Sequence, residues 1–208
     1  MRVMKYIALD FETGNASRLS ACSLGASVFY GNRLQRQVTS LIRPPDEVGK
    51  FHWGNIRIHH ITNEMVEDAP TFDIVWRQLA DEAEDSVFIC HNAQFDISVL
   101  CACLEYYHLP IPNCRYLCTV KMSQRVWVML DNHKLDTVAH ALNIPLNHHE
   151  AGSDAYAAGL ILQAALRSTN SANADILAEK IGMQLGSLSP KGSTPCCIAK
   201  KAPPRTSA

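Results

Sequence analysis

Two acidic residues, Asp10 and Glu12, end the first apolar segment of the chain. The preceding residues Tyr6–Leu9 have the pattern of a short β-strand, in which side chains two positions apart point to the same face. Two carboxylates that converge at a strand end repel each other unless a divalent cation neutralises them. A ligand set made only of oxygen suits Mg²⁺ or Mn²⁺ better than zinc. The same pair is also common at solvated strand ends, so the metal hypothesis needs further carboxylates.

A third carboxylate, Asp96, follows a second buried strand. The apolar residues Val87–Cys90 run into His91 and Asn92, and a helical pattern then begins close to Asp96. Functional sites of open α/β sheets gather at the carboxyl ends of strands, which favours a site here. A carboxylate in the first turn of a helix is also stabilised by the helix dipole. This segment alone therefore leaves both interpretations open.

A histidine and a fourth carboxylate, His149 and Asp154, precede the last long helical pattern. An imidazole with a pKa near neutrality can take a proton from a metal-bound water, and a nearby carboxylate can hold the metal. The neighbouring His148 and Glu150 have the pattern of exposed loop residues, and Ser153 is a suitable helix cap. The segment thus offers one general base and one further metal ligand.

The elements that must position these residues follow an order typical of a mixed α/β sheet. Gly31 and Asn32 form a turn signal between two strand-like segments, which predicts an antiparallel hairpin at the start of the sheet. Helical and strand-like patterns alternate from residue 71 onward. The predicted strands are Tyr6–Leu9, Cys22–Tyr30, Arg33–Ile42, Val87–Cys90 and Arg115–Cys118. We therefore expect an α/β fold in which helices flank a five-stranded mixed sheet.

Composition divides the chain into a body and an extension. Residues 1–169 are predicted to form one domain, and residues 170–208 turn to Ser, Asn, Gly, Pro and Lys. In this extension we expect one short helix over Ala174–Ile181 and a disordered tail from residue 187 onward. The net charge is −1, but residues 191–208 carry four basic and no acidic residues, which leaves the rest of the chain at −5. An acidic body is consistent with carboxylates gathered around a metal.

The eight cysteines show no spacing typical of a zinc site, so we expect buried or free thiols. The apolar run before Asp10 is too short for a leader peptide. No apolar stretch approaches the ~18 residues that a membrane span needs. These features predict a soluble cytoplasmic protein that does not enter a membrane.

Four ordered segments resemble the histidine-containing (DEDDh) branch of a superfamily of 3′–5′ exonucleases. Members of this branch include the epsilon proofreading subunit of bacterial DNA polymerase III, exonuclease X and oligoribonuclease. The likeness runs from about Lys5 to Leu166. The segments are ALDFET at Ala8–Thr13, IHHIT at Ile58–Thr62, HNAQFD at His91–Asp96, and His149 with Asp154 five residues on.

The resemblance implies an RNase H-like fold and a metal-dependent hydrolase that releases nucleoside 5′-monophosphates from a 3′ end. It implies that two Mg²⁺ or Mn²⁺ ions are held by the carboxylates of Asp10, Glu12, Asp96 and Asp154. The family's spacing before the last aspartate selects His149 over His148 as the general base. The residues expected to contact or support the terminal nucleotide are Thr13, Asn92, Phe95, His59 and Ile61.

The natural substrate stays open at this point. The resemblance favours single-stranded DNA with a free 3′ end, and a DNA polymerase or repair complex as a partner. An exoribonuclease would share every catalytic residue, because discrimination of the 2′-OH depends on pocket shape. A catalytically idle nucleic-acid-binding module would lack at least one ligand, and none is missing here. One departure from the family is that Thr13 is followed by Gly14-Asn15-Ala16, where many relatives have Thr-Gly-Leu with a leucine that packs against the terminal base.

Overall fold

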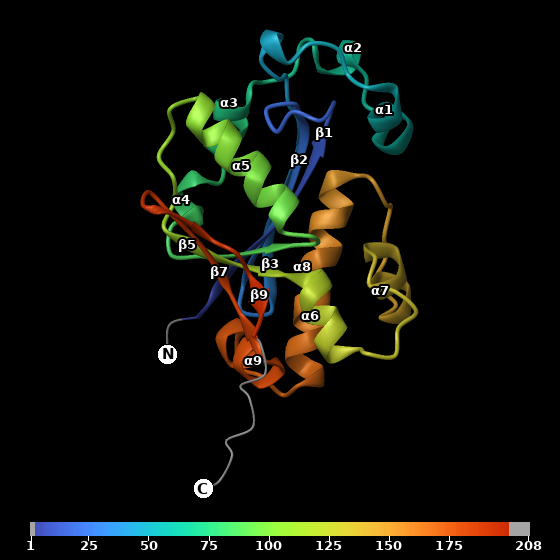
Figure 1. Cartoon of the computed structure of the whole chain (residues 1–208), viewed down its shortest axis with the longest axis vertical. Helices are drawn as coiled ribbons and strands as arrows, with labels where there is room; N and C mark the ends of the chain where they lie inside the picture. Colours follow the sequence, from blue (N-terminus) through green and yellow to red (C-terminus); the bar gives the residue numbers. More distant parts are fainter. Residues whose placement is uncertain (1–2, 200–208) are drawn as a thin grey trace, which may run out of the picture.

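A seven-stranded mixed sheet forms the centre of the molecule, whose computed structural model describes residues 3–199 (Figure 1). Its strands are β1 (Lys5–Thr13), β2 (Ala21–Tyr30), β3 (Arg33–Leu41), β4 (Val87–Cys90), β5 (Cys114–Cys118), β7 (Gly186–Ser189) and β8 (Gly192–Thr194). The order across the sheet is β3-β2-β1-β4-β5-β7-β8. Strand β1 pairs antiparallel with β2 and parallel with β4, so the pairing changes at β1. A separate two-stranded pair is formed by β6 (Met183–Gln184) and β9 (Cys197–Ile198).

Helices cover both faces of this sheet. They are α1 (Trp53–His59), α2 (Asn63–Val66), α3 (Phe72–Trp76), α4 (Ala80–Ala83), α5 (Gln94–Tyr106), α6 (Thr119–Val126), α7 (Leu135–Ala141), α8 (Ala151–Ser168) and α9 (Ala174–Ile181), with a short 3-10 helix at Asp46–Val48. Helix α8 packs over β1 and β2, with α6, α7 and α9 beside it (Figure 1). Helices α3 and α5 lie on the opposite face, where the ring centroids of Phe11 in β1 and Phe72 in α3 are 6.4 Å apart.

Side chains alternate along β1, so successive residues face either the helical layer that contains α8 or the layer that contains α3 and α5. Ala8 faces α8, because a Cβ at Gly159 of α8 would lie 3.4 Å from the Cβ of Ala8. Asp10 and Glu12 are two and four positions further along the strand, so they point to the same face as Ala8. Strand β1 therefore presents both carboxylates to the layer that carries Asp154.

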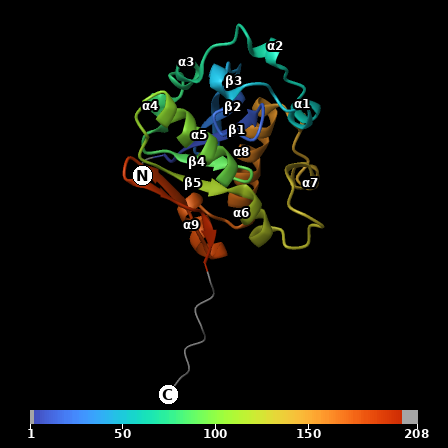
Figure 2. The same cartoon turned by 45° about the horizontal axis from the view of Figure 1, so that its top comes forward.

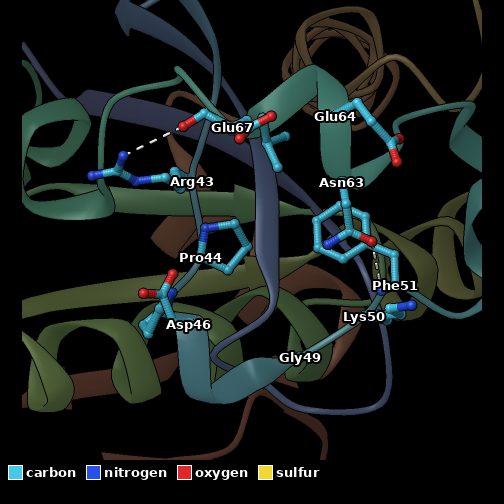
Figure 3. A pocket seen from close by; sticks show the side chains of 11 residues that line it. Arg43, Pro44, Asp46, Gly49, Lys50, Phe51, Asn63, Glu64 and Glu67 are labelled. Atoms are coloured by element: carbon cyan, nitrogen blue, oxygen red, sulfur yellow. Dashed lines mark hydrogen bonds between the residues drawn. The ribbon is translucent and has the colours of Figure 1, made fainter.

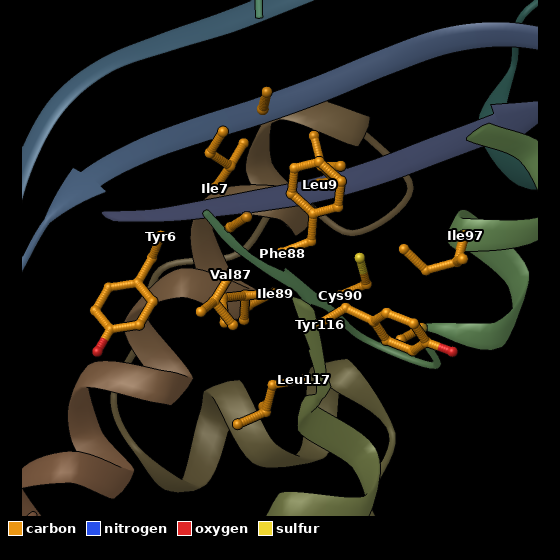
Figure 4. Close-up of a cluster of buried hydrophobic side chains, with 14 of the residues drawn as sticks. Tyr6, Ile7, Leu9, Val87, Phe88, Ile89, Cys90, Ile97, Tyr116 and Leu117 are labelled. Carbon is orange, nitrogen blue, oxygen red and sulfur yellow. The ribbon is translucent and has the colours of Figure 1, made fainter. Parts of the chain in front are cut away.

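The central parallel strands are buried on both sides. All four residues of β4 are fully buried, and they pack with residues of β1 and β5, as Figure 4 shows for Leu9, Phe88 and Tyr116. A strand covered on both faces is a continuous apolar run in the sequence, which is why Val87–Cys90 is recognisable there. This packing fixes the carboxyl end of β4, from which the chain enters α5.

The predicted number of five strands was wrong, because the sheet has seven. The five strands expected from the sequence are β1 to β5, while β8 and all of β7 except Gly186 lie in the segment expected to be disordered. Strand β7 pairs antiparallel with β5 and covers an edge that would otherwise expose unpaired backbone groups. A Cβ at Gly186 of β7 would lie 2.2 Å from the ring of Tyr116, so this strand needs a glycine. Such glycine- and serine-rich strands have low β-propensity and give a weak sequence signal.

The remaining expectations for the extension have mixed outcomes. The predicted helix over Ala174–Ile181 is confirmed as α9. Residues 200–208 of the predicted basic tail lie outside the described residues. All eight cysteines are free thiols, as expected. Within residues 3–199, none of the helices combines the length and the apolar character that crossing a membrane requires.

Candidate active site

The four predicted carboxylates come from β1, α5 and α8, which meet at one end of the sheet. Figure 2 shows this end, where α1 lies close to these three elements. Asp10 and Glu12 belong to β1, Asp96 to the first turn of α5, and Asp154 to the first turn of α8. Carboxylate oxygens of Asp10, Glu12 and Asp154 all lie within 4.8 Å of one another. Residues that are 144 positions apart in the sequence thus form one acidic cluster.

Asp96 connects α5 to β1 and is 1% exposed. Its Oδ1 accepts a hydrogen bond of 3.1 Å from the backbone N–H of Phe11. Its Oδ2 is buried and has no hydrogen-bond partner in the part of the chain that the structure describes. An unpaired buried carboxylate oxygen is costly unless a cation or a proton compensates it. The left-handed backbone of Asn92, with φ of 69°, makes the turn between β4 and α5 that brings Asp96 to this position.

In Asp154, as in Asp96, one carboxylate oxygen accepts hydrogen bonds and the other accepts none from the described residues. Oδ2 accepts from Nδ1 of His148 at 2.9 Å and from the backbone N–H of His149 at 3.1 Å. Oδ1 is buried and lacks a hydrogen-bond partner among residues 3–199. The imidazole rings of His148 and His149 are stacked, with centroids 3.9 Å apart and planes at 19°. The two donors hold one oxygen in place and leave Oδ1 available for a further ligand.

A close approach of backbone to backbone places Asp154 beside β1. Gly25 of β2 is the register partner of Asp10. A Cβ at Gly25 would lie 1.9 Å from the backbone oxygen of Ala151, the first residue of α8. The first turn of α8 therefore rests directly on β2, and only glycine leaves room for it.

We expect Gly25→Ala to displace the N-terminus of α8 and to lower the free energy of unfolding by about 1–3 kcal/mol, the usual cost of overpacking. Urea denaturation followed by circular dichroism measures this change. Gly54→Ala is the matched control, because the added Cβ would meet only the side chain of His52, at 3.0 Å. A Gly25→Ala variant with the urea midpoint of the wild type would contradict this packing argument.

The four carboxylates, His148 and His149 line one open pocket of about 750 Å³. Asn92 and Phe95, which the sequence predicts as nucleotide contacts, line the same pocket. Ile58 and His91, from two of the segments that carry the resemblance, line it as well, and the lining residues outside those four segments include Val120, Gln124, His133, Lys134 and Leu135. Lys134 places a positive charge beside the acidic cluster, but it comes from the connection between α6 and α7, where no motif marks it. Burial lowers the pKa of His91 to about 4, so this lining residue is neutral at physiological pH.

The other predicted nucleotide contacts lie outside the pocket of the carboxylates. Thr13, together with Phe95, lines an adjacent pocket of about 610 Å³. His59 is buried; its Nδ1 accepts from the backbone N–H of Ile61 at 3.0 Å, and its Nε2 donates to the carbonyl oxygen of Thr13 at 3.2 Å. The structure therefore places His59 and Ile61 where they support the end of β1.

Burial and mutual repulsion shape the charge of the acidic cluster. Burial, the nearby Asp96 and Asp154, and Glu12 raise the pKa of Asp10 well above its usual range. Burial and the charge of Asp154 raise the pKa of Glu12 to about 8. Burial, and secondarily His148, lowers the pKa of His149. Without a cation the cluster retains protons near neutrality, while the imidazole of His149 is neutral and able to accept one.

We expect the metal-free protein to lose stability as the pH rises from 5 to 8.5. The pKa of Glu12 is about 8 in the folded chain against an ordinary value of 4.5, so the folded state binds more protons in this interval. A folded state that binds more protons becomes less stable as they are removed. One pKa unit already corresponds to roughly 3–5 °C in Tm for a chain of this size. Thermal unfolding in chelator at several pH values tests this, and a Glu12→Gln variant should show a flatter profile.

A second pocket, of about 410 Å³, lies beside α2 and the 3-10 helix and contains none of the predicted site residues (Figure 3). Its lining mixes cations and carboxylates, among them Arg43, Lys50, Asp46 and Glu64. Arg43 donates to the backbone oxygen of Glu67 at 3.3 Å, as the dashed line in Figure 3 shows. This pocket has no cluster of buried carboxylates, so the acidic pocket remains the candidate site.

Comparison with known proteins agrees with this geometry. The family model of the RNase T type, described as exonuclease, matches residues 7–162. The DNA polymerase III PolC-type of Caldanaerobacter subterraneus subsp. tengcongensis is 27% identical over 74% of this chain, and the 3′–5′ exonuclease DinG of Bacillus subtilis is 26% identical over 77%. The solved structure of exonuclease X in complex with 5′ overhanging duplex DNA has a TM-score of 0.66 and 20% identity, covering 86% of this chain and 99% of that one.

The fold is the RNase H-like fold of exonucleases, a mixed sheet flanked by helices. The chain belongs to the DEDDh-type 3′–5′ exonuclease family, whose members are phosphodiester hydrolases that depend on metal ions. The chain spans only 11% and 17% of the length of the two curated relatives.

Proposed function

We propose that this chain hydrolyses single-stranded DNA from the 3′ end and releases nucleoside 5′-monophosphates, with two Mg²⁺ or Mn²⁺ ions at the acidic cluster. The observation that carries the proposal is the convergence of Asp10, Glu12 and Asp154 within 4.8 Å, beside a buried Asp96. The polymerase and the DNA complex among the similar proteins support DNA over RNA as the substrate.

The residues of the cluster fit divalent cations. All four ligand candidates are carboxylates, the donors that Mg²⁺ and Mn²⁺ prefer. Oδ2 of Asp96 and Oδ1 of Asp154 are buried without a hydrogen-bond partner in the described chain, as expected of oxygens that hold a cation. Ions held by these four carboxylates would supply Lewis-acid chemistry, lowering the pKa of the attacking water and stabilising charge on the leaving 3′ oxygen.

The protein residues divide the remaining tasks. His149 is the proposed general base, because its lowered pKa leaves the imidazole neutral and able to accept the proton of the attacking water. His148 is a positioning residue, since its Nδ1 donates to Oδ2 of Asp154 and its ring stacks on His149. Asn92 and Phe95 line the pocket where the terminal nucleoside would lie.

Digestion of end-labelled oligonucleotides tests the proposed activity. Matched 3′-labelled and 5′-labelled single strands of DNA and RNA are incubated with Mg²⁺, Mn²⁺ or chelator. We expect stepwise shortening from the 3′ end, dependent on metal and faster for DNA. Faster shortening of RNA would replace the DNA assignment with the exoribonuclease, and no cleavage of either polymer would overturn the proposal.

We also propose that a DNA polymerase or a repair complex in the cytoplasm supplies the 3′ ends. Support comes from the PolC-type polymerase, in which the similar segment is part of a much longer chain. Primer extension with a mismatched 3′ terminus tests this role. Addition of this chain should restore extension by a polymerase that lacks its own exonuclease, whereas unchanged stalling would argue against proofreading.

A further inference from the structure

We infer that α1 and the adjacent Arg18 bind the part of the single strand that lies upstream of the 3′ end, with one base stacked on Trp53. We call the surface formed by Arg18, His52, Trp53 and Arg57 the upstream surface. The inference rests on the proposed function, because the terminal nucleotide has to lie at the acidic cluster. It assigns a binding role to residues that the catalytic motifs do not include.

Trp53 offers an exposed aromatic face. It is 68% exposed, although it is one of the largest apolar side chains of the protein. Its ring lies 5.6 Å from that of His52 between centroids, with a tilt of 37°. Exposed aromatic rings are the groups on which the bases of single strands stack, independently of sequence. A nucleobase is therefore a suitable partner for this side chain.

The upstream surface is continuous with the acidic pocket. His52 and Arg18 line the 610 Å³ pocket together with Phe95, and Phe95 also lines the pocket of the carboxylates. Helix α1 reaches both places, because its residue Ile58 lines the carboxylate pocket as well. A strand whose 3′ end lies at the carboxylates can thus pass Phe95 and reach Trp53 without leaving the protein surface.

The charge of the surface suits a phosphate backbone. Residues 48–63 contain no acidic residue, in a chain body that is acidic overall. The guanidinium of Arg18 lies 4.7 Å from the ring centroid of Phe95. Arg57 is four positions after Trp53, which places both on one side of α1. Neither arginine forms an ion pair within the described residues, so both charges are available to phosphates.

Two hydrogen bonds fix this surface relative to the acidic cluster. The side-chain amide of Asn55 donates to the carbonyl oxygen of Thr13 at 2.8 Å. The backbone N–H of His52 donates to the carbonyl oxygen of Gly14 at 2.7 Å. Thr13 is the last residue of β1, the strand that carries two of the carboxylates. The stacking position and the hydrolytic site are therefore held at a constant separation.

Binding and hydrolysis of two substrates test the inference. Fluorescence anisotropy with a labelled ten-nucleotide DNA is measured on an Asp10→Asn background, in which the strand is not degraded. We expect Trp53→Ala to weaken binding about tenfold, Trp53→Phe to retain most of the affinity, and Ile74→Ala, another exposed apolar residue, to change nothing. Arg57→Gln should reduce the slope of log affinity against log salt by about 0.7, whereas Trp53→Ala should leave the slope unchanged.

Hydrolysis by the chain with its native Asp10 separates the two proposals. Trp53→Ala should raise the KM for the ten-nucleotide strand about tenfold, and leave hydrolysis of the p-nitrophenyl ester of thymidine 5′-monophosphate unchanged, since this ester carries one nucleoside only. Equal affinity of the Trp53→Ala and parent proteins would overturn the upstream surface while the exonuclease stands. A different outcome is that Trp53→Ala weakens binding while the wild type hydrolyses neither substrate. That outcome would reject the proposed exonuclease activity and retain the upstream surface as a site that binds single strands.

Discussion

Replacement of Asp10 or Asp154 by alanine is expected to lower the rate of 3′–5′ hydrolysis by about 10³-fold or more. The catalytic contribution of bound metal ions amounts to several kcal/mol, and each 1.36 kcal/mol is a factor of ten in rate. Carboxylate oxygens of both residues lie within 4.8 Å of each other and of Glu12, so each variant removes one of the proposed ligands. Release of labelled mononucleotide from a 5′-overhanging or single-stranded DNA measures the loss.

The same variants should remain folded when metal is absent. Burial raises the pKa of both carboxyl groups, and their charges repel, so removal of one relieves the other. We expect the Tm in chelator to be equal to or above that of the wild type, whereas Mg²⁺ should raise the Tm of the wild type only. Asp68→Ala, a change at an exposed carboxylate outside the site, is the control. Near wild-type hydrolysis by Asp10→Ala or Asp154→Ala would refute the ligand assignment.

His149→Ala is expected to lower kcat by about 10²–10⁴-fold, the usual contribution of a general base. The folded protein keeps the pKa of this imidazole below its ordinary value, chiefly through burial. The variant should therefore lose the acidic limb of the pH–rate profile as well as the rate. Measurement of kcat between pH 5 and 9 tests both effects, because a purely structural role would lower the rate without changing the profile.

The adjacent His148 provides the comparison that decides which of the two histidines is the general base. Its Nδ1 donates to Asp154, and an asparagine amide can place a donor near that position, whereas the longer glutamine cannot. We expect His148→Asn to retain most of the activity, and His148→Gln to raise the metal concentration needed for half-maximal rate. A greater loss of kcat for His148→Asn than for His149→Ala would show that the two histidines have been assigned in the wrong order.

The sequence predicts much of the fold because its central elements have strong periodicity. The apolar run Val87–Cys90 and the hairpin around Gly31 are recognisable from local pattern, and both occur in the structure. The strands β7 and β8 are not recognisable, because Gly186 is selected by contact with Tyr116, a residue far away in the sequence. Tertiary packing, rather than propensity, specifies that edge of the sheet.

The acidic site is predictable for a different reason. Asp10 lies in the carboxyl-terminal half of β1, and Asp96 and Asp154 lie in the first turns of α5 and α8. The alternation of side chains along β1 and the order of the strands bring these positions together. The sequence cannot predict Lys134 or the role of Gly25, since both depend on how distant elements approach one another. It also cannot distinguish a residue that touches the nucleotide from one that supports it, as the buried position of His59 shows.

The most direct test of the two-ion site is a calorimetric titration of the metal-free protein with Mn²⁺, in the presence of thymidine 5′-monophosphate, a product of the proposed reaction. We predict two Mn²⁺ ions per wild-type chain, and at most one for Asp154→Asn, which removes a charge while keeping the size of the side chain. Absence of Mn²⁺ binding to the wild type, or identical binding to Asp154→Asn, would contradict the proposal that these four carboxylates form the hydrolytic centre.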